Sequence, residues 1–210
     1  MSVAYIPKQF SFDGLIKQHD FIEKHNFGQL IVAKTRTLNV AHLPFFLDRN
    51  FKPKGRLLCH VATSNPIWED IHSANVVAVF SGPHAYISPK WYVTNDQVPT
   101  WNNSAIYAHV TAKIIEQPDL GKHLSQLVER EEKLMSPDKP WSVEEISSAT
   151  YESMQKYIIG IELSISSIEA KMKMSQNRNP EDRMGVVEQL EVIGSEQTRS
   201  VASMIKSEFK

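Results

Sequence analysis

The sequence predicts a mainly β protein, a closed or half-closed antiparallel barrel with flanking helices. Its 210 residues, 41% hydrophobic and 22% charged, suit one sizeable core. Runs rich in alternating apolar residues are frequent, and they are separated by turn-forming segments such as Asp48-Arg49-Asn50 and Pro53-Lys54-Gly55. We therefore expect residues 1–210 to form a single domain.

The first strands are expected over Gly28–Lys34, Leu38–Leu47 and Arg56–Ala62, paired as an antiparallel meander. Later segments that alternate or are rich in β-branched residues predict four more strands, over Asn75–Ser81, His84–Ser88, Ser104–Glu116 and Ile158–Ile168. Gly82-Pro83 is expected to separate the first two of these, because proline cannot donate to a strand ladder.

Helical spacing of apolar residues, with suitable caps, predicts helices over Asp13–His25, Asn65 to about Ser73, Leu120–Leu134, Tyr151–Tyr157, Glu181–Ile193 and Glu196–Phe209. Asn65 precedes a proline and can cap free backbone N–H groups. The last two helices occupy about residues 180–210 and are joined by Gly194-Ser195, so they form either a helix-turn-helix or a pair that packs on the barrel or on a partner. Glutamates beside Arg199 and Lys206 make the second helix a poor match to DNA phosphates.

The charge and cysteine content limit the classes of partner. The chain carries 24 acidic and 23 basic residues, a formal net charge of -1, so no global field attracts nucleic acid or anionic lipid. No run approaches the ~20 apolar residues of a membrane span, and the first residues lack a secretory signal. The single cysteine, Cys59, excludes an internal disulfide and a cysteine-rich metal site. We expect a cytoplasmic protein without a membrane segment.

Several common chemistries lack support. His42, His60 and His84 have no HExxH motif or carboxylate cluster beside them, so no metal site is expected. Cys59 and His60 are neighbours in a strand and point to opposite faces, which favours a buried thiol over a nucleophile. Hydrolase, P-loop and dinucleotide-binding glycine motifs are absent from the sequence.

Three clusters can each bind a ligand or be purely structural. His42 lies in a strand next to Pro44, which indicates an edge or a bulge. A set of cations and short hydrogen-bond donors could hold a phosphate or form a solvated face, namely Lys173, Ser175, Gln176, Asn177 and Arg178. Trp91, Tyr92 and Trp101 could stack on a flat heterocycle, or plug the barrel mouth and a dimer contact.

Six short motifs in a fixed order carry a family resemblance. They are Tyr5-Ile6-Pro7, His42-Leu43-Pro44, His60 with Asn65-Pro66-x-Trp68, the run from Gly82 to Tyr92, Val98-Pro99-Thr100-Trp101-Asn102, and Lys173-x-Ser175-Gln176-Asn177-Arg178. From Tyr5 to about Val187 the chain resembles the PaiB family of FMN-binding proteins, described as negative transcriptional regulators of protease synthesis and sporulation.

The resemblance implies an FMN-binding split β-barrel, related to pyridoxamine-phosphate oxidases and flavin reductases, and a homodimer with flavin between its subunits. It places FMN against the backbone of His42-Leu43-Pro44, its phosphate at Lys173 to Asn177, and Trp91 or Trp101 over the ring. The implied flavin contacts are His42, Leu43, Pro44, His60, Asn65, Ser88, Trp91, Thr100, Trp101, Asn102, Lys173, Ser175, Gln176 and Asn177.

Three functions remain in competition at this point. The first is an FMN-binding transcriptional regulator or flavin-based sensor. The second is a flavin-dependent oxidoreductase of the same fold, of the flavin reductase or haem-degrading type, in which His42 or His60 donates protons while FMN carries electrons. The third is a repressor that contacts DNA through the second helix after Gly194-Ser195. The sequence leaves open whether the protein is an enzyme.

Overall fold

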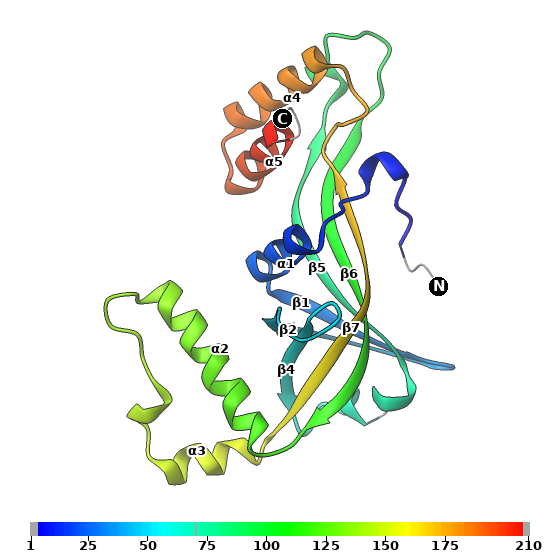
Figure 1. The fold of residues 1–210 in the computed structure, drawn as a ribbon. Coiled ribbons are helices and arrows are strands. Elements are labelled where there is room, and N and C mark those ends of the chain that lie inside the picture. The colour runs from blue at the N-terminus through cyan, green and yellow to red at the C-terminus, as the bar shows by residue number, and fades with distance from the viewer. Residues whose placement is uncertain (1–3, 70, 208–210) are drawn as a thin grey trace. The chain divides into compact units, whose positions relative to one another are not determined.

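A computed structural model of the chain describes residues 4–69 and 71–207. Its α-helices are α1 (Leu15–Lys24), α2 (Asp119–Met135), α3 (Ser148–Gln155), α4 (Pro180–Ile193) and α5 (Glu196–Ser207). Its strands are β1 (Phe27–Lys34), β2 (Thr37–Pro44), β3 (Phe46–Asp48), β4 (Arg56–Ala62), β5 (Asn75–Ile87), β6 (Thr100–Ile115) and β7 (Ile158–Lys173). Short 3₁₀ turns are η1 (Lys8–Phe10), η2 (Pro66–Trp68), η3 (Ile71–Ser73), η4 (Pro89–Trp91) and η5 (Val143–Glu145). The mainly β class with flanking helices is confirmed (Figure 1). Residue 70, inside the helix expected from Asn65, and residues 208–209, at the end of the last expected helix, lie outside the described residues.

The seven strands form one sheet in the order β2-β1-β5-β6-β7-β4-β3. The predicted meander is confirmed in part, since β1 pairs antiparallel with β2, and β3 with β4. The three runs are not neighbours in one continuous stretch of the sheet, because β4 pairs on its other side with β7, with Cys59 opposite Ile161. The predicted strand over Leu38–Leu47 is wrong, since the chain divides there into β2 and β3. The division follows Pro44 at Phe45, whose buried ring meets Phe80 edge-on at a centroid distance of 5.2 Å. The break at Phe45 lets the chain pass from β2, at one end of the strand order, to β3, at the other end.

Strand β5 runs without interruption through Gly82-Pro83, so the predicted separation there is wrong. Burial falls mainly on even-numbered residues up to Phe80 and on odd-numbered residues from Pro83 to Ile87. A shift of one residue in the pattern is the effect of a bulge, which glycine and proline both favour. The carbonyl of Pro83 also accepts a hydrogen bond of 3.1 Å from Ser104 Oγ, which ties the shifted segment to β6.

The described chain divides into two compact units, which we call unit 1 and unit 2. Unit 1 holds residues 4–21, 81–107 and 169–207, and unit 2 holds residues 22–69, 71–80 and 108–168. Strands β5, β6 and β7 each contribute residues to both units. The expectation of a single domain stays a prediction.

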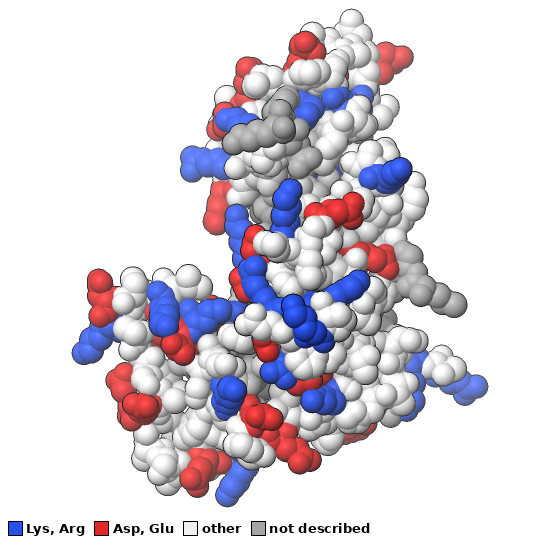
Figure 2. All heavy atoms as spheres, in the orientation of Figure 1, with Lys and Arg blue, Asp and Glu red and all other residues white. Residues whose placement is uncertain are grey.

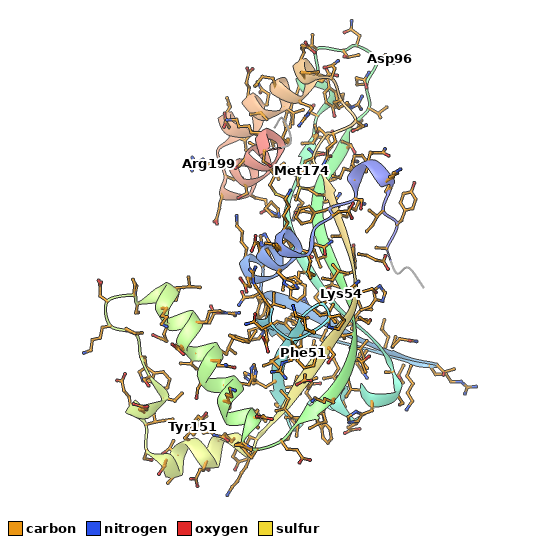
Figure 3. All side chains as sticks on the ribbon, in the orientation of Figure 1. Phe51, Lys54, Asp96, Tyr151, Met174 and Arg199 are labelled. Carbon is orange, nitrogen blue, oxygen red and sulfur yellow. The ribbon has the colours of Figure 1, made fainter. Side chains whose placement is uncertain are left out.

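The core of unit 1 is formed by α4 and α5 against the ends of β5 and β7. Its fully buried members include Ile87, Met174 (labelled in Figure 3), Leu190 and Ile205. The two helices pair because Gly194, in the left-handed region at φ 69°, closes α4 and lets the chain reverse into α5. The expected pair of C-terminal helices is therefore present.

Gly185 of α4 packs against the backbone of η4, since an added Cβ would lie 2.3 Å from the carbonyl oxygen of Trp91. Gly185→Ala should lower the free energy of unfolding by about 1–2 kcal/mol, because overpacking against a backbone outweighs the gain of about 1 kcal/mol in helix propensity. Gly121→Ala in α2 is the matched control, since the nearest atoms to its Cβ would be side-chain atoms, the closest at 3.4 Å. That variant should be more stable by about 0.5–1 kcal/mol. Urea unfolding of both variants checks the pair, and a stabilised Gly185→Ala protein would contradict the close packing.

In unit 2, α2 and α3 form an excursion between β6 and β7 (Figure 1). Leu120 of α2 packs with Leu58 and Ile115 of the sheet, and Phe46 and Leu124 cover the contact. Acidic and basic side chains are interspersed over this excursion on the face drawn in Figure 2. Among the described residues, no helix combines the length and the apolar character that crossing a membrane requires.

Candidate functional site

The predicted flavin contacts fall into two groups. Unit 1 holds Ser88, Trp91, Thr100, Trp101, Asn102, Lys173, Ser175, Gln176 and Asn177. Unit 2 holds His42, Leu43, Pro44, His60 and Asn65. Each group is described within its own unit.

Unit 1 carries an exposed cluster of aromatic rings on β5 and β6. Trp101 is 54% exposed, and its ring centroid lies 5.6 Å from that of His84 and 6.1 Å from that of Tyr86. Because side chains alternate along a strand, Ala85 and Ile87 point into the α4–α5 core and leave the other two on the uncovered face. We call His84, Tyr86 and Trp101 the β5–β6 aromatic face.

Lys173 ends β7 beside the start of β6, the strand that carries Trp101. Met172 and Met174, its neighbours on either side, pack with the α4–α5 core, so Lys173 points away from that core. Its Nζ donates a hydrogen bond to Thr100 Oγ1 and lies 5.8 Å from the ring centroid of Phe10. The ammonium is therefore held in place beside the strand that carries Trp101.

Positive charge is concentrated around Lys173. Partial burial lowers the pKa of Lys173, and the charges of Lys171 and Arg178 lower it further. The Arg178 guanidinium lies 4.6 Å from the ring centroid of Tyr92 and donates to the side chain of Gln97. Cations that lie close enough to disfavour one another's charge are stabilised by a bound anion.

Most of the predicted phosphate contacts in the loop after β7 already make hydrogen bonds within the protein that stabilise the loop. Asn102 Nδ2 donates to Ser175 Oγ at 2.9 Å, and both residues are buried. Ser175 adopts the left-handed region at φ 61°. The amide of Gln176 accepts from Met174 N at 2.7 Å and donates to Met172 O at 2.6 Å. In the loop segment that follows β7, Asn177 alone among the predicted contacts is exposed.

Ser88 and Trp91 lie at η4. Ser88 Oγ accepts a hydrogen bond from Lys90 N at 3.3 Å and so caps this turn. Trp91 is partly buried against the α4–α5 core. Both side chains therefore stabilise the fold of unit 1, and their contact with flavin stays a prediction.

In unit 2, His42 is exposed on β2 and stacks on Phe27, with ring centroids 6.4 Å apart. β2 stands at one end of the strand order, so the edge indicated by Pro44 is confirmed. Leu43 is buried on the opposite face of the same strand. Asn65 Oδ1 accepts from Ile67 N at 3.1 Å, which confirms its capping of η2.

His60 has a partner that the sequence reasoning missed. Its Nδ1 lies 3.5 Å from Nε2 of His123 on α2, and the His123 side chain is 1% exposed. Burial lowers the pKa of His60, and burial together with the charges of His60 and Arg130 lowers the pKa of His123 to about 4. Both imidazoles are therefore neutral near pH 7. A signal was available, because His123 follows Leu120 at the spacing of the apolar face of α2.

Acid should destabilise the chain through His123. Because its folded pKa lies below the ordinary value of 6.5, the unfolded chain binds more protons, so stability is full above pH 6.5 and falls toward pH 4. The expected slope is about 1.4 kcal/mol per pH unit in this window. Urea unfolding at several pH values measures it. His123→Gln should flatten the slope, and His72→Gln, at an exposed histidine, should keep it; equal slopes in all three proteins would contradict the assignment.

Cys59 is fully buried, and burial raises the pKa of its thiol. The thiolate needed for nucleophilic chemistry is therefore disfavoured, and the expectation of a buried thiol is confirmed. Within residues 4–69 and 71–207, no three side chains of histidine, cysteine, aspartate or glutamate lie where they could hold a metal ion.

His84 and Tyr86 were also missing from the predicted contacts. Their sequence signal is the alternation His84-Ala85-Tyr86-Ile87, in which polar aromatics and apolar residues take turns. Only the position of the α4–α5 core decides which of the two sets is exposed.

Solved structures with this fold define the class of protein. The chain resembles the FAD and heme binding protein from Mycobacterium smegmatis with a TM-score of 0.60 and 10% identity, over 88% of this chain and 80% of that chain. It resembles the flavocytochrome Anf3 from Azotobacter vinelandii with a TM-score of 0.55 and 11% identity, over 86% and 78%. The sheet and its flanking helices are those of the flavoprotein split β-barrel, and the expected fold class is confirmed.

Within that class the family is defined by sequence. Residues 4–167 match the family described as "Putative FMN-binding domain", and the chain therefore belongs to this family. It is 31% identical over 98% of its length to the Protease synthase and sporulation protein PAI 2 of Bacillus subtilis, of which 98% is covered. The resemblance to the PaiB family is confirmed. The family match ends before Lys173, whereas the similarity to the Bacillus protein extends over nearly the whole chain.

Proposed function

We propose that this chain binds FMN on the β5–β6 aromatic face, with Lys173 taking the phosphate. The observation that carries the proposal is that an exposed tryptophan, flanked by two further rings, directly follows the threonine that holds the Lys173 ammonium. A planar ligand with an anionic tail matches both features, because ring faces stack on heterocycles and an ammonium attracts phosphate. Membership of a family described by FMN binding supports the same ligand.

The residues present fit such a ligand. Trp101 gives a broad apolar surface for one side of the flavin ring. The ring of Tyr86 packs edge-on against Trp101, and the ring of His84 packs against it at a tilt of 45°. Lys173, in the field of Lys171 and Arg178, gives a positive site for the phosphate. When bound, FMN supplies electron-transfer chemistry, and the protein supplies position and electrostatics.

FMN titration tests the proposal. Wild-type protein should quench FMN fluorescence to saturation, and Trp101→Leu should weaken binding about fivefold, by loss of roughly 1 kcal/mol of stacking. Trp141→Leu is the matched control, because Trp141 lies in the α2–α3 excursion of unit 2. Absence of quenching by wild-type protein would remove the proposal, and equal affinity of the two variants would remove Trp101 from the site.

We also propose a homodimer, supported by an uncharged outer face on β1 and β2. The four outward pairs across these strands are Phe27 with Pro44, Gln29 with His42, Ile31 with Val40 and Ala33 with Leu38. Their alternate neighbours Leu30, Val32, Ala41 and Leu43 are buried. Val40 is 51% exposed, and an edge sheet face without charge is suited to pairing with a second copy of itself.

Val40→Asp should shift the protein from dimer to monomer, because a carboxylate placed in an apolar contact is desolvated without a partner. Light scattering coupled to size exclusion measures the mass. Val98→Asp, at an exposed valine of unit 1, should leave the dimer intact. A wild-type monomer, or a dimer that survives Val40→Asp, would contradict the proposed face.

We propose that the chain has a regulatory or sensing role and does not turn over a substrate with its flavin. This role is in keeping with the relative named for protease synthesis and sporulation. Direct contact of α4 and α5 with DNA is poorly supported, because residues 180–207 carry five acidic and three basic side chains. The alternative is a flavin-dependent oxidoreductase of the same fold. Anaerobic NADPH separates the two: unchanged flavin absorbance supports the sensor, and rapid bleaching supports the oxidoreductase. The single buried cysteine agrees with a cytoplasmic location.

A further inference from the structure

Unit 2 contains a cavity of about 470 Å³ whose lining includes none of the predicted flavin contacts. One wall is the first two turns of α2. The other is formed by β3, the turn after it and β4, together with Ile115 of β6, Glu162 of β7 and Glu23 of α1. This volume is in the range of sites for small organic ligands. No part of the FMN proposal uses it.

The charges on the sheet wall are already paired. Arg56 Nη1 donates to Glu162 at 2.6 Å, and its Nε donates to Asp48 at 3.0 Å. Arg49 holds Glu23 of α1 through two hydrogen bonds, one of them 2.8 Å long. These pairs make the wall polar and rigid while leaving no strong local charge of either sign.

The helix wall offers opposite charges that lack such partners. Asp119, Lys122 and Gln126 lie at positions i, i+3 and i+7 of α2 and all line the cavity. Among the described residues, neither Asp119 nor Lys122 takes part in an ion pair. His123 lines the same wall and adds no charge near neutral pH.

The near-equal numbers of positive and negative side chains in the cavity favour a ligand that carries both charges. Its lining carries three cations and four carboxylates, so an anion or a cation meets nearly as many repelling groups as attracting ones. A small molecule with one charge of each sign meets Lys122 and Asp119 at once. Phe46, Leu58 and Ile115 give the cavity an apolar part for a hydrocarbon side chain.

We propose that this cavity binds a small zwitterion of the α-amino acid class with an aliphatic side chain. Lys122 binds the carboxylate, Asp119 binds the ammonium, and the apolar part of the lining holds the side chain. The site is independent of flavin, so it gives a flavoprotein of this family a second, effector-like ligand.

Calorimetric titration of the full chain with L-leucine tests the proposal. We expect saturable binding of L-leucine. The analogues 3-methylbutylamine and 4-methylpentanoate, each of which lacks one of the two charged groups, should bind about tenfold or more weakly than L-leucine. Asp119→Asn and Lys122→Gln should each weaken L-leucine binding by a similar factor. Both side chains are exposed, so unchanged melting temperatures should show that the variants fold.

The control variant is Lys206→Gln in α5 of unit 1, which should bind L-leucine like wild type. Absence of heat with millimolar L-leucine would overturn the proposal. Equal binding of the single-charge analogues, or wild-type affinity in both α2 variants, would overturn it as well.

Discussion

Lys173→Met should weaken FMN binding about 30-fold and leave riboflavin binding unchanged. The loss corresponds to roughly 2 kcal/mol, the range for a charge-assisted hydrogen bond to phosphate. The ammonium is fixed by Thr100, so little entropy opposes its use, and two further cations raise the local potential. Riboflavin shares the ring and lacks the phosphate, so it separates a phosphate contact from a general change of the site.

Fluorescence titration of both flavins with wild type and Lys173→Met gives the four affinities required. Similar losses for FMN and riboflavin would show that Lys173 supports the site without meeting the phosphate. No loss for either flavin would place the phosphate elsewhere. Methionine retains most of the apolar stem of lysine and removes the ammonium that lies 5.8 Å from the ring centroid of Phe10.

Arg56→Met should lower the free energy of unfolding by about 3 kcal/mol, because removing one partner leaves a buried carboxylate uncompensated. Glu162 is the carboxylate concerned: its side chain is 7% exposed, and it accepts from Arg56 at 2.6 Å. Lys113 also contacts it at 3.0 Å, although that ammonium is largely exposed and solvent weakens its effect. The Arg56 guanidinium further covers the ring of Phe51, 4.7 Å from its centroid.

Urea denaturation measures the change. Lys206→Met is the control, because its ion pair with Glu191 is half exposed on both sides and should leave the unfolding midpoint in place. A double variant, Arg56→Met with Glu162→Gln, should recover part of the lost stability, since the second change removes the uncompensated charge. Equal stability of Arg56→Met and Lys206→Met would contradict the role given to Glu162.

Much of the secondary structure could be predicted because it depends on local signals. The Asn65 cap and the Gly194 turn are each set by residues adjacent in sequence, and both are present. The apolar spacing in α2 likewise predicted its ends to within a residue.

Strand pairing could not be predicted in the same way. The runs that became β1, β2 and β4 are all rich in apolar residues, and no local signal shows that β4 pairs with the distant β7. Gly82-Pro83 was expected to interrupt a strand, yet it shifts the burial pattern of a continuous one. Long-range packing decides both outcomes, and the sequence pattern alone does not contain it.

The candidate site shows the same division. Trp101 and Lys173 were identified from residue type and Thr100 from the family resemblance, and the structure brings Lys173 and Thr100 into contact. The hydrogen bonds of Gln176 to the backbone of Met172 and Met174 depend on the local turn of the chain, so they could not be predicted from the sequence. The contact of His60 with His123 joins residues 63 positions apart, so only the folded chain could reveal it.

A crystal structure of the protein grown with FMN would test the central claim most directly. The account predicts flavin density with the ring against Trp101 and the phosphate within hydrogen-bond distance of Lys173 Nζ. Bound flavin that touches neither residue would contradict the account.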